Sequence, residues 1–196
     1  MAHGAYETEI KLAVPDAKTA RRILRAAGFR VSRPRVFESN IIFDTPGLAL
    51  RQAATLLRVR EAGPTATVTY KGPPVASRHK SREELEVAIS RAAAMRGIFE
   101  HLGFGPVFRY EKFRTEFRRA GASGTAMLDE TPVGVYLELE GTSRWIDRTA
   151  RQLGFAESAY ITSSYARLYL DWCERQHVTP SHMVFKAAPR RPVSAR

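Results

Sequence analysis

Apolar and polar residues alternate along much of the chain with a period of two, which is the pattern of a β-strand with one buried face. Each alternating run ends in glycine, proline or other turn-forming residues. The runs predict eight strands, at residues 5–12, 29–43, 55–62, 65–71, 82–89, 107–119, 125–130 and 133–140. Short turns between most of them favour antiparallel pairing, and eight antiparallel strands can close into a barrel that leaves no free edge.

Four other segments have the spacing of helices rather than strands. They lie at residues 15–27, 91–102, 143–153 and 162–174. Gly28 and Gly103 follow the first two and are typical helix ends. We therefore expect an α+β fold, in which helices flank an eight-stranded antiparallel barrel.

Charged residues recur at alternate positions on nearly every predicted strand. The carboxylates are Glu7, Glu9, Glu84, Glu86, Asp129, Glu138 and Glu140, and the bases are Lys11, Arg58, Arg60, Lys71, Arg82, Lys112 and Arg114. On one strand, such charges would simply mark the face in contact with water. Repeated on strand after strand, they place like charges side by side, and such pairs usually need an opposite charge between them.

These charges acquire a specific chemistry if they line the inside of a barrel. Buried ions are costly unless they are paired or coordinated. Carboxylate pairs suit hard divalent cations such as Mg²⁺ or Mn²⁺, whereas arginine and lysine suit phosphate oxygens. A cavity with both kinds of group would suit a complex of a metal ion with a polyphosphate.

The same residues form motifs of a known family. Glu7-Thr8-Glu9-Ile10-Lys11 resembles the Glu-x-Glu-x-Lys motif that opens the CYTH domain, or triphosphate tunnel metalloenzyme, superfamily. Similar motifs follow in the family's order: Phe43-Asp44-Thr45-Pro46, Leu57-Arg58-Val59-Arg60, Tyr70-Lys71-Gly72-Pro73, Arg82-Glu83-Glu84-Leu85-Glu86, Lys112-Phe113-Arg114, Leu128-Asp129-Glu130, Leu137-Glu138-Leu139-Glu140 and Ser164-Tyr165. The resemblance spans about residues 5–172.

The resemblance implies a tunnel whose charged strand faces point inward. It implies hydrolysis of inorganic triphosphate, or of an organic triphosphate such as thiamine triphosphate, with Mg²⁺ or Mn²⁺. By position it implies metal ligation by Glu7, Glu9, Glu84, Glu86, Asp129, Glu138 and Glu140, substrate binding by Lys11, Arg58, Arg60, Lys71, Arg82, Lys112 and Arg114, and catalysis by Glu7, Glu9, Lys11, Glu138 and Glu140. The expected partner is a small molecule that contains a triphosphate.

Two other functions stay open. Some family members cyclise ATP instead, so a class IV-type adenylate cyclase is one alternative, and a non-catalytic module that binds polyphosphate or nucleotide is another. Some members also carry a tyrosine shortly before the Asp-Thr-Pro turn, paired with the lysine of the first strand. This chain has Ile41 and Ile42 there, so the group that activates water stays unassigned.

The net charge of the chain says less about its function than the alternation of charged residues along the strands does. The 196 residues carry 31 Lys and Arg against 20 Asp and Glu, a net +11, which predicts an anionic partner. Residues 175–196 hold five bases and no acid, so we expect a domain at 1–174 and a flexible basic tail at 175–196. Bases interleaved with acids, without a reader motif, argue against nucleic acid.

The remaining expectations concern the compartment and the assembly. The single cysteine, Cys173, excludes an internal disulfide and a cysteine zinc cluster. No apolar run has the length of a membrane span, and residues 1–7 lack the apolar core of a signal peptide, so we expect a cytoplasmic protein with no membrane partner. Whether it forms a homodimer stays open.

Overall fold

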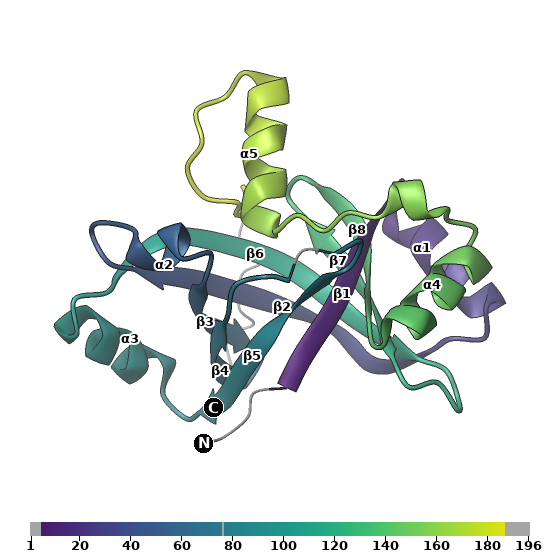
Figure 1. The fold of residues 1–196 in the computed structure, drawn as a ribbon, viewed down its shortest axis with the longest axis horizontal. Coiled ribbons are helices and arrows are strands. Elements are labelled where there is room, and N and C mark those ends of the chain that lie inside the picture. The colour runs from purple at the N-terminus through teal and green to yellow at the C-terminus, as the bar shows by residue number, and fades with distance from the viewer. Residues whose placement is uncertain (1–4, 76, 187–196) are drawn as a thin grey trace, which may run out of the picture.

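The eight strands form a closed antiparallel barrel. The structure is a computed structural model that describes residues 5–75 and 77–186. Its strands are β1 (Ala5–Val14), β2 (Arg30–Asp44), β3 (Leu56–Ala62), β4 (Thr65–Lys71), β5 (Lys80–Ile89), β6 (Gly105–Arg118), β7 (Thr125–Thr131) and β8 (Gly134–Glu140). They follow one another around the barrel in the order β1-β5-β4-β3-β2-β6-β7-β8, and the long strands β2 and β6 lie side by side across the molecule (Figure 1). The predicted fold class is confirmed.

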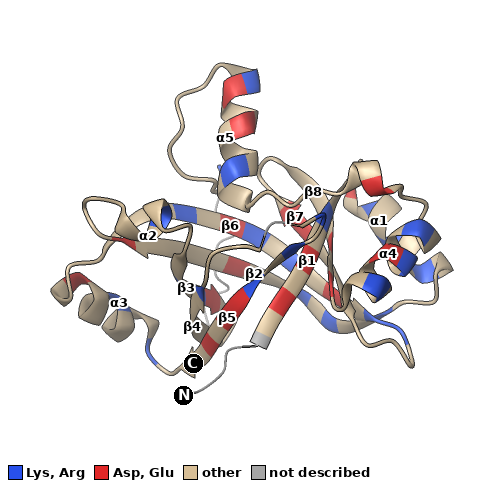
Figure 2. Cartoon of the chain, viewed as in Figure 1, with Lys and Arg blue, Asp and Glu red and all other residues tan. Residues whose placement is uncertain are grey.

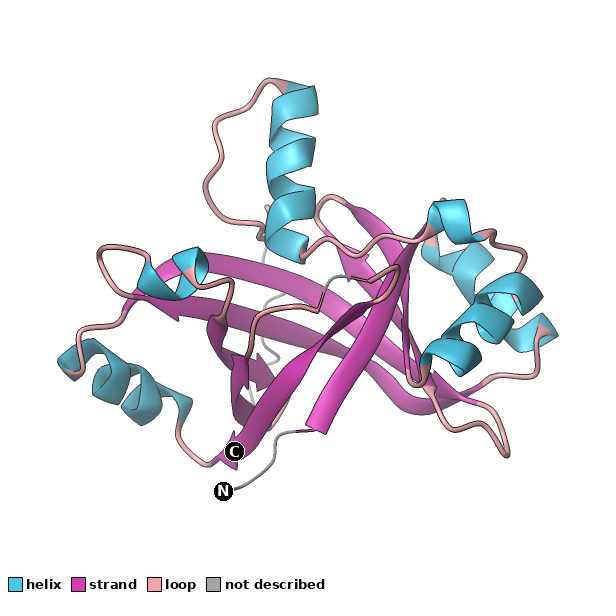
Figure 3. Ribbon diagram, in the orientation of Figure 1, coloured by secondary structure: helices cyan, strands magenta, loops and turns pink. Residues whose placement is uncertain are grey.

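Helices lie on the outside of this barrel (Figure 3). They are α1 (Ala17–Ala26), α2 (Ala49–Gln52), α3 (Ala92–His101), α4 (Ser143–Gln152), a 3₁₀ turn at Glu157–Ala159, and α5 (Tyr165–Gln176). The four long helices are the predicted ones. The sequence did not predict α2 and the 3₁₀ turn, because three or four residues are too few to show a helical period.

Side chains fix where several elements begin. The Asp16, Thr142 and Ser164 side chains cap α1, α4 and α5 by accepting hydrogen bonds from backbone N–H groups three residues further on. The Asp44 carboxylate accepts from the N–H groups of Thr45, Leu50 and Arg51. The Asp-Thr-Pro motif therefore organises the turn from β2 into α2, which explains its aspartate structurally.

The apolar faces of the strands point outward, under the helices. Between the barrel and helices α1 and α4 lies a core that includes Leu12, Phe29, Leu137 and Ile146, all fully buried. Trp145 of α4 packs edge-on against Phe29. Because the helices cover apolar surface from outside, the polar strand faces are left to line the interior.

The chain after α5 returns to the barrel. Met183 is buried, its backbone N–H donates to the Arg109 carbonyl over 3.0 Å, and the Glu111 N–H donates to the Met183 carbonyl over 2.8 Å. The segment expected as a basic tail thus has two parts. Residues 175–186 belong to the packed structure, and residues 187–196 lie outside the described residues.

Candidate functional site

The inside of the barrel is a charged cavity of about 430 Å³. It brings together thirteen of the fourteen residues predicted from the sequence: Glu7, Glu9, Lys11, Arg58, Arg60, Lys71, Arg82, Glu84, Glu86, Lys112, Arg114, Glu138 and Glu140. The lining also includes Arg33, Lys80, Glu116 and Arg118, which gives ten bases against seven carboxylates. The charged faces therefore point inward, and the cavity has an excess of positive charge.

The lining charges are sorted by strand. Figure 2 marks all the charged residues along the ribbon. Six carboxylates and only three bases lie on the adjacent strands β8, β1 and β5, which we call the acidic arc: Glu7, Glu9, Glu84, Glu86, Glu138 and Glu140, with Lys11, Lys80 and Arg82. Seven bases and one carboxylate lie on β4, β3, β2 and β6, which we call the basic arc: Arg33, Arg58, Arg60, Lys71, Lys112, Arg114 and Arg118, with Glu116.

Lysines hold the carboxylates of the acidic arc. Both Lys11 and Lys80 donate to the same Glu9 oxygen, Oε1, over 3.2 and 2.7 Å, and Lys11 also lies 3.7 Å from Glu138. Lys71, at the neighbouring edge of the basic arc, pairs with both Glu7 and Glu84. Several carboxylates therefore share few cations.

The pKa values reflect this shortage. Burial and the neighbouring Glu9 raise the pKa of Glu7 to about 7, in spite of Lys71. Burial and Glu138 raise the pKa of Glu140. Burial would also raise the pKa of Glu9, but Lys11 and Lys80 outweigh it and hold that pKa well below its usual value. Two carboxylates of the arc thus lack a sufficient counter-charge.

The basic arc is supported by buried carboxylates that lie beside its bases. Asp129 is fully buried and outside the cavity lining, and it is the fourteenth predicted residue. Arg114 donates to both its oxygens over 2.7 and 2.6 Å, Lys112 donates over 2.8 Å, and the Tyr165 hydroxyl donates over 2.6 Å. Together these donors hold the pKa of Asp129 far below its usual value, although burial alone would raise it.

Glu38 of β2 has a similar role beside the bases of the arc. Its carboxylate lies 3.6 Å from Arg60 and 3.5 Å from Lys112. Burial opposes ionisation, but Lys112, Arg114 and Arg60 lower the pKa of Glu38 to about 2. Sequence reasoning did not single out Glu38, although it shares the alternation of its predicted strand with Asn40 and Ile42. Lys80 was missed because the predicted strand began two residues later, at Arg82.

Arg82 differs from the other lining bases predicted from sequence. It is 9% exposed, yet among residues 5–75 and 77–186 it forms no ion pair and no hydrogen bond. Burial, together with the nearby cations Lys11 and Arg82, lowers the pKa of Lys80 below its usual value, although Glu9 opposes this. The Arg82 guanidinium is therefore, among the described residues, a buried cation without a paired anion, which would favour a bound anion there.

Two tyrosines complete the wall. Tyr165, at the start of α5, lies under Lys11 and Lys112, whose ammonium nitrogens are 5.2 and 5.0 Å from its ring centroid. Tyr110 of β6 accepts a hydrogen bond from Arg58 over 3.2 Å. Burial would raise the pKa of Tyr110, but Arg58 and Arg60 lower it. Ile42 lines the cavity beside these rings and offers no hydroxyl.

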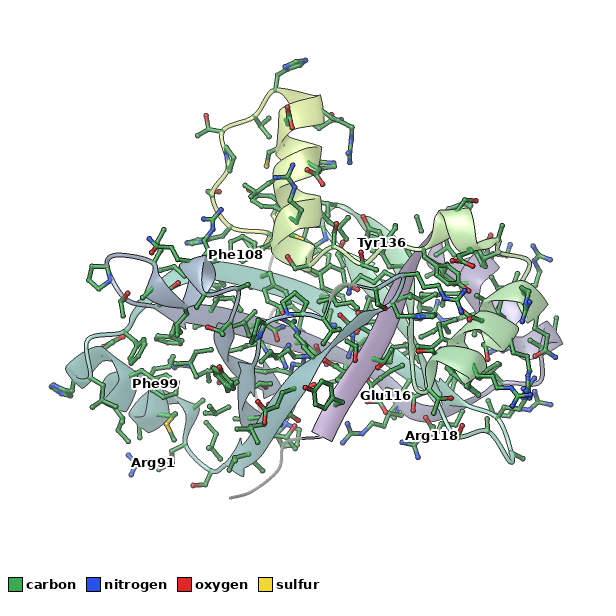
Figure 4. The ribbon with its side chains drawn as sticks, in the orientation of Figure 1. Arg91, Phe99, Phe108, Glu116, Arg118 and Tyr136 are labelled. Atoms are coloured by element: carbon green, nitrogen blue, oxygen red, sulfur yellow. The ribbon has the colours of Figure 1, made fainter. Side chains whose placement is uncertain are left out.

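The cavity has two unlike ends along β6 (Figure 4). Phe108, beside the start of α5, belongs to an apolar part of the lining with Ile42 and Leu56. Glu116 and Arg118 lie toward the opposite end of β6. The α5 end can therefore contact an organic group through several apolar side chains, whereas charged residues dominate the other end, beside Thr125 and Met127.

The donor set of the acidic arc fits a hard divalent cation. Its ligands would all be carboxylate oxygens, which Mg²⁺ and Mn²⁺ prefer. In the described part of the chain no three acidic, histidine or cysteine side chains converge as a ready metal site, because lysines stand between the carboxylates. The raised pKa values of Glu7 and Glu140 show that added positive charge would be stabilising there.

Comparison with known proteins identifies the class. The CYTH domain family matches residues 5–183, so the chain belongs to this family. A relative from Methanocaldococcus jannaschii, named "putative adenylate cyclase", is 33% identical over 135 residues, which cover 68% of this chain and 75% of the relative. CYTH tunnel enzymes bind triphosphates such as ATP and act with divalent metal ions.

Solved structures share the fold. A protein from Vibrio parahaemolyticus, also named "putative adenylate cyclase", is 21% identical with a TM-score of 0.73, covering 84% of this chain and 98% of that one. A protein from Hippeastrum, described as a "putative adenylyl cyclase" with a dominant triphosphatase activity, is 18% identical with a TM-score of 0.58, covering 89% and 97%. None of the helices within the described ranges is long and apolar enough to cross a membrane.

Proposed function

We propose that this protein is a divalent-metal-dependent triphosphatase. The substrate is inorganic triphosphate or an organic triphosphate such as thiamine triphosphate. The observation that carries this proposal is the sorting of the cavity charges, with six carboxylates on the acidic arc and seven bases on the basic arc. A metal–triphosphate complex has the matching polarity, because its cation faces carboxylates and its phosphate oxygens face bases.

The residues of the two arcs take different roles. Glu7, Glu9, Glu138 and Glu140, with Glu84 and Glu86, would hold Mg²⁺ or Mn²⁺. When bound, the metal supplies charge compensation at phosphate oxygens and lowers the pKa of a coordinated water molecule. Arg58, Arg60, Lys71, Lys112 and Arg114 bind the phosphates, and the arginines can do so bidentately.

Hydrolysis places the greatest demand on the basic arc. Water adds to the terminal phosphorus and loses a proton to the solvent, the bond to the bridging oxygen breaks, and that oxygen leaves with its electron pair on the diphosphate. Preorganised cations stabilise this developing charge. Asp129 and Glu38 are assigned to hold Lys112, Arg114 and Arg60 in position, because their oxygens lie close to those bases on the same strand faces.

The apolar α5 end favours one alternative. Ile42, Leu56 and Phe108 can contact a nucleobase, so ATP is a candidate substrate. As an adenylate cyclase, the protein would direct the ribose 3′-hydroxyl at the α-phosphorus and release diphosphate. As a binding module, it would hold the same ligands without turnover.

One assay distinguishes these functions. The purified chain is incubated with inorganic triphosphate, thiamine triphosphate or ATP, with Mg²⁺, Mn²⁺ or EDTA, and phosphate, diphosphate and cyclic AMP are measured. Metal-dependent release of phosphate supports the triphosphatase. Cyclic AMP with an equal amount of diphosphate supports the cyclase, and tight binding without products supports the binding module.

A pair of matched variants links the activity to the cavity. Glu7→Ala with Glu138→Ala removes two carboxylates of the acidic arc, and the activity should be lost. Glu100→Ala with Glu174→Ala removes two exposed carboxylates that form no ion pair in the described structure, and the activity should persist. Full activity in the first double variant contradicts the assignment.

A further inference from the structure

Tyr110 places a hydroxyl group in the tunnel wall that has no role in the reaction described so far. On β6 it alternates with Phe108 and Lys112, and all three side chains line the cavity. Tyr110 therefore lies between the apolar α5 end, where Phe108 is seen in Figure 4, and the bases of the basic arc. Its ring stacks on that of Phe108, with 6.0 Å between the centroids, and lies 6.1 Å from that of Tyr165.

The Tyr110 hydroxyl accepts a hydrogen bond but has no acceptor for its own proton. Arg58 donates to it from Nη1 over 3.2 Å, and to the Thr69 hydroxyl from Nη2 over 2.9 Å. In the parts of the chain that the structure describes, the Tyr110 O–H donates to no protein group. A guanidinium carries only donors, so the O–H is left to donate elsewhere. Because buried polar groups are normally paired, the missing acceptor points to a ligand.

A bound triphosphate supplies such acceptors. Arg58, which contacts the hydroxyl, and Lys112, two residues along β6, are both assigned to phosphate oxygens. A triphosphate with its organic group against Phe108 brings its inner phosphates to Tyr110 and extends its terminal phosphate toward Arg114. The inner phosphates are those that leave as the diphosphate, so the hydroxyl faces the leaving group.

The charges around Tyr110 suit a proton donor. Burial would raise the pKa of its hydroxyl, but Arg58, Arg60 and Lys112 lower it below the ordinary value of 10.0. The buried cluster around its ring also contains these titratable side chains from β8 and α5: Tyr136, Tyr165, Tyr169 and Cys173. A general acid is more effective when its pKa lies closer to the working pH, and the Arg58 guanidinium stabilises the phenolate that remains.

We propose that Tyr110 is a catalytic residue, whose hydroxyl donates its proton to the oxygen that leaves on the diphosphate. This inference rests on the proposed function. As the bond between the terminal phosphorus and the bridging oxygen breaks, that oxygen keeps the electron pair and takes the Tyr110 proton. The phenolate regains a proton from the solvent, which has received one from the attacking water, so the protons balance over one turnover.

The first test is kinetic. Tyr110→Phe keeps the packed ring and removes only the hydroxyl, so kcat for metal-dependent hydrolysis should fall about a hundredfold. KM should stay within about threefold, because the hydroxyl acts mainly in the transition state. Tyr70→Phe removes the same atom from a tyrosine of β4 outside the cavity lining, and should change both constants less than about twofold. Circular dichroism checks that each variant has the native fold.

The pH dependence distinguishes a proton donor from a group that only positions Arg58. In the wild type, kcat/KM should fall as the pH rises through the lowered pKa of Tyr110, because the phenolate has no proton to give. This alkaline fall should be absent from Tyr110→Phe. Arg58→Gln removes a cation that lowers this pKa, so the fall should move to higher pH. The Arg58→Gln profile remains a test if Tyr110→Phe does not fold.

A titration without turnover tests the contact with phosphate. The ultraviolet absorbance of the phenolate is followed against pH, and the difference between the wild type and Tyr110→Phe reports Tyr110. Diphosphate, added without a metal ion, should raise the midpoint by about one pH unit, because a bound anion disfavours the phenolate.

Several results would overturn the inference. They are a wild-type kcat in Tyr110→Phe, a rise in KM alone, an alkaline fall that neither variant alters, and a Tyr110 titration that diphosphate does not shift. If the wild type hydrolyses no triphosphate, the proposed function fails and the catalytic role with it. The diphosphate titration then still shows whether the hydroxyl meets phosphate, so the two failures are distinguishable.

Discussion

The two arcs of the tunnel wall differ in how fully their carboxylates are compensated by positive charge. On the acidic arc, lysines outweigh burial and lower the pKa values of Glu9 and Glu84, whereas burial and a neighbouring carboxylate raise the pKa values of Glu7 and Glu140. Beside the bases of the basic arc, Glu38 and Asp129 each face several cations, and their pKa values are lowered. The basic arc is thus internally compensated, whereas the acidic arc needs additional positive charge.

This difference singles out Glu7 and Glu140 as the carboxylates with the greatest need for added positive charge. A buried carboxylate with a lowered pKa already has the partners that repay its desolvation. A buried carboxylate with a raised pKa is held close to other carboxylates, which lowers the stability of the fold. Such an arrangement is typical of a site that binds a ligand. Arg82 is the complementary case, a buried cation whose counter-charge is absent from the described residues.

The largest effect should come from the two carboxylates with raised pKa. Glu7→Gln with Glu140→Gln keeps the shape of the acidic arc and removes two charges. We expect kcat/KM for the metal-dependent reaction to fall about a thousandfold, since a catalytic metal ion supplies several kcal/mol. The melting temperature should stay equal or rise, because repulsion between carboxylates is relieved.

Steady-state kinetics at saturating Mg²⁺ and thermal unfolding check both halves of this prediction. Glu100→Gln with Glu174→Gln is the matched control, since both residues are exposed outside the cavity. A loss of less than tenfold, or a large fall in melting temperature, would show that these carboxylates are structural.

The carboxylates that support the basic arc should affect the unfolding free energy at low pH. The pKa of Glu38 is lowered from 4.5 to about 2, so its charge stabilises the fold above pH 4.5 and this contribution is lost as the pH falls toward 2. The shift corresponds to roughly 3 kcal/mol. The unfolding free energy of the wild type should fall between pH 5 and pH 2, in part because Glu38 becomes protonated. In Glu38→Gln this fall should be smaller by about the same amount.

Urea unfolding at several pH values measures this difference. Glu100→Gln serves as the control, and its curve should run parallel to that of the wild type because Glu100 is exposed and unpaired in the described structure. Parallel curves for Glu38→Gln and the wild type would contradict the support that Glu38 is assigned to Arg60 and Lys112.

Substitution of Arg82 should lower the activity without lowering the stability of the fold. Arg82→Met removes a cation without leaving a carboxylate unpaired, so we expect kcat/KM to fall about a hundredfold while the unfolding free energy stays equal or rises. Arg114→Met should behave differently, because it leaves the buried Asp129 carboxylate without its main counter-charge. We expect the unfolding free energy to fall by about 3–5 kcal/mol. Kinetics and urea unfolding of both variants test the contrast, which fails if Arg82→Met also unfolds readily.

The sequence was sufficient for the barrel because alternation is a local signal. Each strand shows its two faces through neighbouring residues, and the motifs carried by those faces supplied thirteen residues of the cavity lining. The sorting into two arcs was not predictable in this way. It depends on β1 lying between β5 and β8, a pairing of segments more than 70 residues apart.

Asp129 shows the same limit at a single residue. Its alternation with Met127 and Thr125 is that of a lining residue, and both neighbours do line the cavity. Only the packed structure shows that Arg114, Lys112 and Tyr165 occupy its oxygens. A sequence pattern assigns a side chain to a face, but the partners that it meets there come from other strands.

The smallest effect should come from the apolar α5 end, and it sharpens the choice of substrate. Phe108→Leu should lower kcat/KM about tenfold for ATP or thiamine triphosphate, because stacking of a base on an aromatic ring contributes about 1–3 kcal/mol. Inorganic triphosphate has no organic group, so its kcat/KM should change less than about twofold. Val107→Ala, an exposed change at the adjacent position, is the control. Equal losses for both kinds of substrate would show that Phe108 supports the cavity wall and contacts no organic group.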